Sequence, residues 1–109
     1  MNVRTFFVST IAVLLLASLT AFAADQTMSG KVSDSMCGVK HGMGDAAACT
    51  RACVKQGSKY ALVVGEKVYT LETSDQAALK KLDELAGANA KVTGEVKGDT
   101  IAVKTVAGS

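Results

Sequence analysis

The sequence contains no proline and no tryptophan, and its aromatic residues are three phenylalanines and two tyrosines. All three phenylalanines precede residue 24, so the rest of the chain has only Tyr60 and Tyr69. A surface that binds single-stranded nucleic acid needs several aromatic side chains along a basic groove. A charge excess is also missing, since 12 basic residues face 10 acidic ones. These shortages argue against nucleic-acid binding, and we expect the tyrosines in the core or in cross-strand contacts.

Long apolar runs are also scarce, and the one strongly apolar stretch lies at the N-terminus. Arg4 precedes an apolar run over residues 11–16, and the segment ends in Ala21-Phe22-Ala23. A basic start, a short apolar run and a small-x-small ending are typical of a signal peptide. We therefore predict that residues 1–23 are cleaved and that the protein is periplasmic or secreted, without membrane association. The alternative is an uncleaved anchor, but serines and threonines interrupt the roughly 20 apolar residues that a spanning helix needs.

Residues 24–109 are expected to form a single small domain with an insert at residues 34–57. A chain of this size buries only about 60% of the surface that its unfolded state exposes, so its core is marginal. Small exported domains commonly add disulfides or a metal ion. All three cysteines and the only histidine lie within the insert.

The residue pattern predicts a mainly β domain with two short helices. Period-two runs and turn residues predict five strands, at residues 27–33, 59–64, 67–72, 90–97 and 100–106. One helix is expected at residues 46–56, and another between a capping box at residues 73–76 and Gly87. This order is that of an OB-fold, a five-stranded Greek-key barrel, here with a loop-helix insert after the first strand and a helix between the third and fourth. An open α+β sheet is the alternative.

The first strand is expected to be half-buried. Its apolar face includes Val32, and its polar face ends in Ser33, which we expect to point outward.

The chemistry of the sequence is concentrated in Cys37, His41, Cys49 and Cys53, which lie within 17 residues. Cys49 and Cys53 are four residues apart on a predicted helix, so they project from one face. Cys37 and His41 precede that helix in a glycine-rich loop. Three thiolates and an imidazole complete a tetrahedral zinc shell. Because Cu(I) also prefers thiolates and thioethers and two methionines flank the cluster, the four residues predict a site for zinc or copper.

A disulfide is the main alternative for the same cysteines. Cys49 and Cys53 are poor partners for each other, because their Cβ atoms are too far apart on a regular helix. Cys37 would therefore bridge to one of them and leave the third thiol free. The protein would then be a disulfide-stapled, non-catalytic interaction module of the cell envelope with an unknown envelope protein as its partner. A resting disulfide, with metal binding only after reduction, would reconcile the two hypotheses.

A thiol-based redox protein is the third alternative. Cys37 and His41 can form a reactive thiolate–imidazolium pair. However, no third catalytic group lies at a recognisable spacing, and the chain has no Cys-x-x-Cys motif. We therefore expect a non-enzymatic protein. Asp34 beside the cluster is either an acceptor for His41 or a turn residue, and the turn role is favoured.

Several short segments, spread over nearly all of residues 24–109, resemble those of one protein family. They are Asp34, Cys37-Gly38, His41, Cys49, Cys53, Gly57-Ser58-Lys59-Tyr60-Ala61-Leu62-Val63, Gly87 and Lys91-Val92-Thr93-Gly94. The chain thereby resembles small exported bacterial proteins, mostly of unknown function, that combine an OB-like body with a cysteine- and histidine-bearing insert. The resemblance implies export and the fold, and it implies no particular activity.

Overall fold

The computed structural model describes residues 24–40 and 45–109, so the predicted signal peptide and His41 lie outside the described residues. Within these ranges, the chain forms all the strands and helices that the sequence predicts, with ends that differ by at most two residues. Their order is β1 (Gln26–Asp34), α1 (Ala46–Lys55), β2 (Tyr60–Val64), β3 (Lys67–Glu72), α2 (Gln76–Glu84), β4 (Asn89–Lys97) and β5 (Thr100–Gly108). None of the described helices has the length and apolarity needed to cross a membrane.

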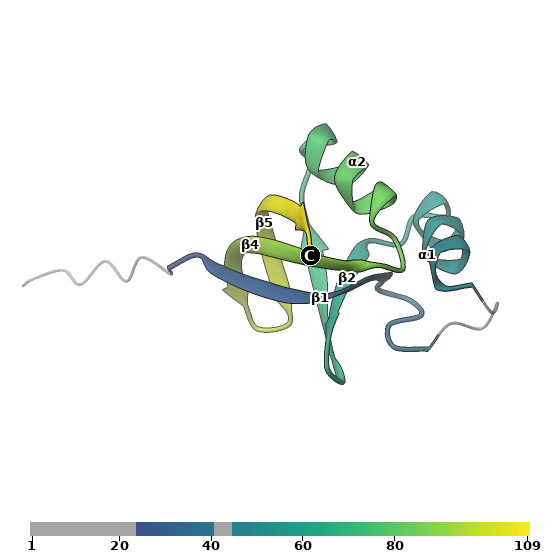
Figure 1. Ribbon diagram of the computed structural model, residues 1–109, viewed down its shortest axis with the longest axis horizontal. Helices are drawn as coiled ribbons and strands as arrows, with labels where there is room; N and C mark the ends of the chain where they lie inside the picture. The colour runs from purple at the N-terminus through teal and green to yellow at the C-terminus, as the bar shows by residue number, and fades with distance from the viewer. Residues whose placement is uncertain (1–23, 41–44) are drawn as a thin grey trace, which may run out of the picture.

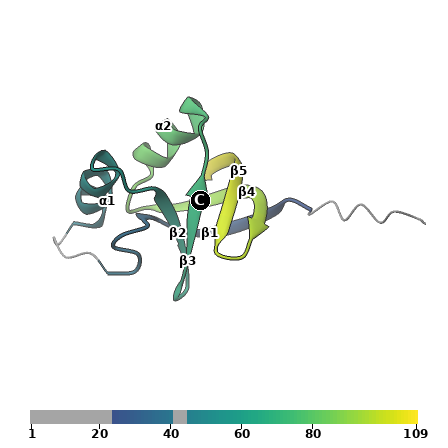
Figure 2. The same cartoon turned by 180° about the vertical axis from the view of Figure 1, so that it is seen from behind.

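The five strands form a closed barrel in the order β1-β2-β3-β5-β4, with β4 pairing back onto β1 (Figures 1 and 2). Four of the pairings are antiparallel, and the pairing of β3 with β5 is parallel. Because the sheet closes, each of the described strands pairs with a neighbour on both sides, which limits the edge that it offers to another chain. The predicted five-stranded barrel is confirmed, and the alternative of an open sheet is wrong.

The barrel encloses a small core that the two tyrosines share with aliphatic side chains. Its buried members are Val32, Tyr60, Leu62, Tyr69, Leu71, Leu82, Ala90, Val92 and Ile101. Leu82 of α2 is fully buried and joins the helix to this core. The Tyr60 hydroxyl donates to Asp83 Oδ1 at 3.4 Å, so its polar end is satisfied at the same helix. The expected core position of both tyrosines is confirmed.

The start of α2 differs from the predicted capping box. The N-cap is Asp75, whose side chain accepts from the Ala77 N–H, and not Thr73. Thr73 instead accepts from the Asp75 N–H at 3.1 Å through its hydroxyl. Aspartate is at least as good an N-cap as threonine, and with Thr73 holding the preceding turn, the helix begins two residues later than a Thr73 cap would give.

The insert is fixed to the barrel through α1, which lies next to α2 in both views (Figures 1 and 2). Arg51 of α1 donates to the Asp83 carbonyl oxygen through Nε at 3.2 Å and Nη2 at 3.0 Å. Gly87, with φ of 77°, allows a close approach, because a Cβ there would lie 2.8 Å from the Ala47 nitrogen. These contacts hold α1 at the corner between α2 and β4.

Candidate metal centre

Cys37 is positioned by a tight loop that begins where β1 ends. Asp34 Oδ2 accepts from the Met36 N–H at 3.1 Å and from the Cys37 N–H at 3.0 Å. The Asp34 carbonyl accepts from the Gly38 N–H at 2.9 Å, and Gly38 adopts a positive φ of 55°. Such side-chain-to-backbone bonds are how aspartate stabilises a turn. The expected turn role of Asp34 is confirmed, and it fixes Cys37 relative to the barrel.

Ser33 adds a second restraint to the same loop. Its hydroxyl donates to the Gly38 carbonyl oxygen at 2.7 Å, and its side chain is fully buried. The prediction that Ser33 points to solvent is wrong, because the loop after β1 folds back over this end of the strand. A polar residue at the last outward position of a strand, just before a glycine-containing loop, is the only sequence signal of this contact.

Cys49 and Cys53 lie on α1, one turn apart. Asp45 caps the helix by accepting from the Ala47 N–H at 3.1 Å. Cys49 is only 4% exposed, whereas Cys37 and Cys53 are half-buried. The Cys49 thiol therefore lies on the buried side of the site, and the Cys37 and Cys53 thiols lie on the side that solvent reaches.

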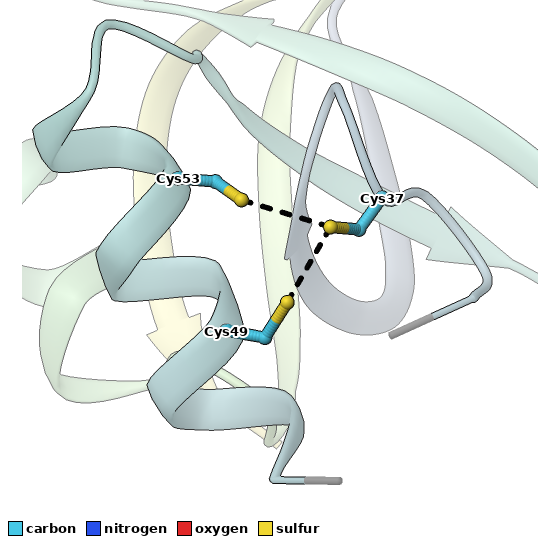
Figure 3. A group of neighbouring side chains, drawn as sticks. All are labelled: Cys37, Cys49 and Cys53. Atoms are coloured by element: carbon cyan, nitrogen blue, oxygen red, sulfur yellow. Dashed lines mark hydrogen bonds between the residues drawn. The ribbon is translucent and has the colours of Figure 1, made fainter. Parts of the chain in front are cut away.

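The three sulfur atoms point toward one another from these two segments (Figure 3). Cys37 Sγ lies 3.4 Å from Cys49 Sγ and 3.6 Å from Cys53 Sγ, and all three atoms lie within 4.8 Å of one another. Zn–S bonds of about 2.3 Å place the sulfurs of a tetrahedral site about 3.8 Å apart. The triangle of sulfurs thus has nearly the size of one face of a zinc–thiolate tetrahedron.

In the metal-free site, the surroundings of Cys37 and Cys53 favour the protonated form of these two thiols. Hydrogen bonding with Cys49, then with Cys53, followed by burial and the charge of Asp34, raises the pKa of Cys37 to about 12. For Cys53, the hydrogen bond with Cys37 lowers the pKa, but burial and the Asp34 charge outweigh it and the pKa is raised. Metals bind thiolates, so a cation must displace these protons. Metal binding is therefore expected to release protons and to weaken as the pH falls.

A buried carboxylate oxygen adjoins the cluster. Asp34 is fully buried, and its Oδ1 has no hydrogen-bond partner of good geometry among the described residues. A buried carboxylate is costly unless hydrogen bonds or an opposite charge compensate it, and besides its two backbone N–H donors Asp34 has a hydrogen bond with the Cys53 thiol that raises the pKa of Cys53. Beside three thiols, it favours a cation in the site.

Asp34→Asn is expected to lower zinc affinity by about 10- to 100-fold, as is typical when a residue that supports metal ligands is changed. Asparagine keeps an acceptor for the Met36 and Cys37 N–H groups but removes the negative charge. Affinity is measured by competition with a chromophoric chelator. Asp45→Asn is the matched control, because asparagine caps helices as well as aspartate does. Equal losses in both variants, or no loss in Asp34→Asn, would contradict the prediction.

Three of the four predicted ligands are therefore brought together, and the fourth, His41, is not among the described residues. No family model, no curated protein and no solved structure matches this chain.

Proposed function

We propose that this protein is an exported, non-enzymatic metal-binding domain that holds zinc or copper through Cys37, Cys49, Cys53 and His41. The observation that carries the proposal is the convergence of three sulfur atoms, within 4.8 Å of one another, from two separate segments. Both segments are fixed independently, one by Asp34 and Ser33 and the other by its contacts with α2. Such a preformed set of soft donors is what zinc and Cu(I) select.

His41 is the proposed fourth ligand. It follows Cys37 by four residues and is the only imidazole in the chain. Zinc completes its shell with four donors, whereas Cu(I) is satisfied by thiolates and thioethers. A zinc site therefore depends on His41, and a copper site does not. His41→Ala is therefore expected to lower the affinity for zinc and to leave the affinity for Cu(I) nearly unchanged, and an unchanged affinity for zinc would show that His41 is not a ligand.

Storage, delivery or sensing of a metal ion is the role that this chemistry supports, in the periplasm or outside the cell. The thiols at the open side of the site, Cys37 and Cys53, give an ion or a metal-donating partner direct access. The N-terminal sequence pattern of residues 1–23 is the support for export.

The test is to purify the protein from the compartment to which its cells deliver it, without chelator, and to measure bound metal and free thiols on one sample. One equivalent of zinc or copper and three thiols recovered after denaturation support the proposal. A metal-free protein that takes up no zinc or Cu(I) after reduction overturns it. Because the N-terminus of the purified protein is read in the same preparation, cleavage after residue 23 is tested at the same time.

A disulfide-stapled interaction module is the second candidate, and one observation favours it. Met36 is 72% exposed and Val39 is 52% exposed, and both lie on the loop that carries Cys37. Two large apolar side chains on a loop pinned by a disulfide can contact a protein partner. A single free thiol without bound metal, together with no uptake of zinc or Cu(I) after reduction, supports this candidate over the first.

A further inference from the structure

Cys37 occupies a special position among the three cysteines. Its sulfur is almost equally far from the other two, at 3.4 Å from Cys49 and 3.6 Å from Cys53 (Figure 3). It also lies on a loop, whereas Cys49 and Cys53 are held one turn apart on α1. A disulfide needs Cβ atoms about 3.5–4.5 Å apart, while residues one turn apart on a helix have Cβ atoms about 5–6 Å apart. Cys37 can therefore bond to either helix cysteine, and the two helix cysteines cannot bond to each other.

We infer that the cluster is a site of reversible oxidation, in which Cys37 forms a disulfide with either Cys49 or Cys53 and the metal ion is expelled. The expulsion of the metal rests on the proposed function, whereas the pairing of the cysteines in disulfides does not depend on it. The oxidant is a small-molecule disulfide, of which oxidised glutathione is the probe. The metal-bound state and the disulfide state share the same sulfur atoms, so the two states exclude each other.

The reaction balances in two exchange steps. The Cys37 thiolate attacks one sulfur of the small disulfide, the S–S bond of that molecule breaks, and one small thiolate leaves. The thiolate of Cys49 or Cys53 then attacks the Cys37 sulfur, forms the protein disulfide and displaces the second small thiolate. The two protein sulfurs lose two electrons, and the two sulfurs of the small disulfide gain them and leave as small thiols, which take protons from the protein thiols or from water. Cys37 makes the first attack in preference to Cys49, because Cys37 is half-buried and Cys49 is only 4% exposed. Cys53 is also half-buried, and where it attacks first, the Cys37 thiolate attacks the Cys53 sulfur in the second step.

Expulsion of the metal follows from the loss of ligands. Each disulfide removes two of the three thiolates, and one remaining thiolate cannot hold zinc or Cu(I) at the affinity of the complete site. The third cysteine still lies next to the disulfide, because Cys37 contacts both partners. Its thiolate can attack Cys37 and move the disulfide from one helix cysteine to the other. The oxidised protein is therefore expected to be a mixture of two disulfide isomers.

The experiment treats the purified, zinc-loaded protein with oxidised glutathione. A chromogenic chelator follows zinc release, and peptide mapping by mass spectrometry identifies the disulfides after the free thiols are alkylated. We expect one zinc ion to leave for each disulfide formed, with both Cys37–Cys49 and Cys37–Cys53 detected and no Cys49–Cys53. Cys37→Ser is expected to form only mixed disulfides with glutathione. Cys49→Ser and Cys53→Ser are each expected to form one intramolecular disulfide.

The outcomes separate this inference from the proposed function. A Cys49–Cys53 disulfide in the wild-type protein, or an intramolecular disulfide in Cys37→Ser, overturns the role of Cys37. Zinc that stays bound after a disulfide has formed overturns the exclusion of the two states. If the reduced protein binds no metal, the proposed function fails, and disulfide mapping of the metal-free wild-type protein still tests the pairing of Cys37. Because that mapping needs no variant, a variant that fails to fold does not remove the test.

Discussion

Cys53→Ser is expected to lower the affinity for zinc by at least about 100-fold. A hydroxyl is a poor replacement for a thiolate ligand, and even residues that only support ligands cost about 10- to 100-fold when changed. Cys53 is the best cysteine for this test because it is half-buried, whereas Cys49 is part of the buried core. Serine at position 53 therefore keeps the helix and its packing while it removes one of the three sulfurs.

The measurement is a competition titration with a chromophoric chelator, followed by the absorption spectrum of the protein loaded with Co²⁺. Thiolate-to-cobalt charge-transfer absorption in the near ultraviolet is expected to fall by about one third, since one of three thiolates is lost. Ala52→Ser is the matched control, because it places the same side chain on the preceding residue of α1 and keeps all three thiols. Unchanged zinc affinity in Cys53→Ser would show that the three cysteines do not form the site.

The barrel was predictable from the sequence because its strands carry local signals. The period-two pattern of β4 and β5 and the Gly98-Asp99 turn identify a hairpin without any knowledge of the rest of the chain. Barrel closure differs from these local signals, since the pairing of β1 with β4 joins residues that are 58 to 68 positions apart, such as Thr27 and Thr93. Only the resemblance of the element order to an OB-fold predicted that pairing, and local patterns alone left an open sheet equally consistent.

The candidate site was predictable in part for a similar reason. The four-residue spacing of Cys49 and Cys53 fixes their common direction once a helix is expected. The approach of Cys37 depends on a loop whose shape comes from hydrogen bonds of Asp34 and Ser33. Those bonds require Ser33 to be buried, and the alternating pattern of β1 predicts the opposite. A sequence pattern therefore identifies the ligands but not their distances, because tertiary contacts determine how the loop folds back.

Gly94→Ala is expected to destabilise the protein by about 3 kcal/mol or more, at or above the usual upper range for overpacking. Gly94 lies in β4 beside an irregularity in the pairing with β5. A Cβ there would clash with the carbonyl oxygen of Ala102 and lie 2.9 Å from its carbonyl carbon. Because the neighbour is backbone of a paired strand and not the end of a flexible side chain, the barrel must deform to make room.

Thermal unfolding of the metal-free, reduced protein measures this effect, and a loss of about 3 kcal/mol lowers Tm by about 10 °C or more in a domain of this size. Gly98→Asn in the β4–β5 turn is the matched control, because nothing lies within 4 Å of a Cβ there and its φ of 58° is one that asparagine tolerates. A Tm of Gly94→Ala equal to that of the control would show that the strands are not so closely packed.

Gly94 pairs with Gln26 at the start of β1, and the nine residues of β1 place this pair roughly 26 Å from Asp34 at its end. Zinc should therefore raise the Tm of the variant and of the wild type by similar amounts, since distant sites contribute independently.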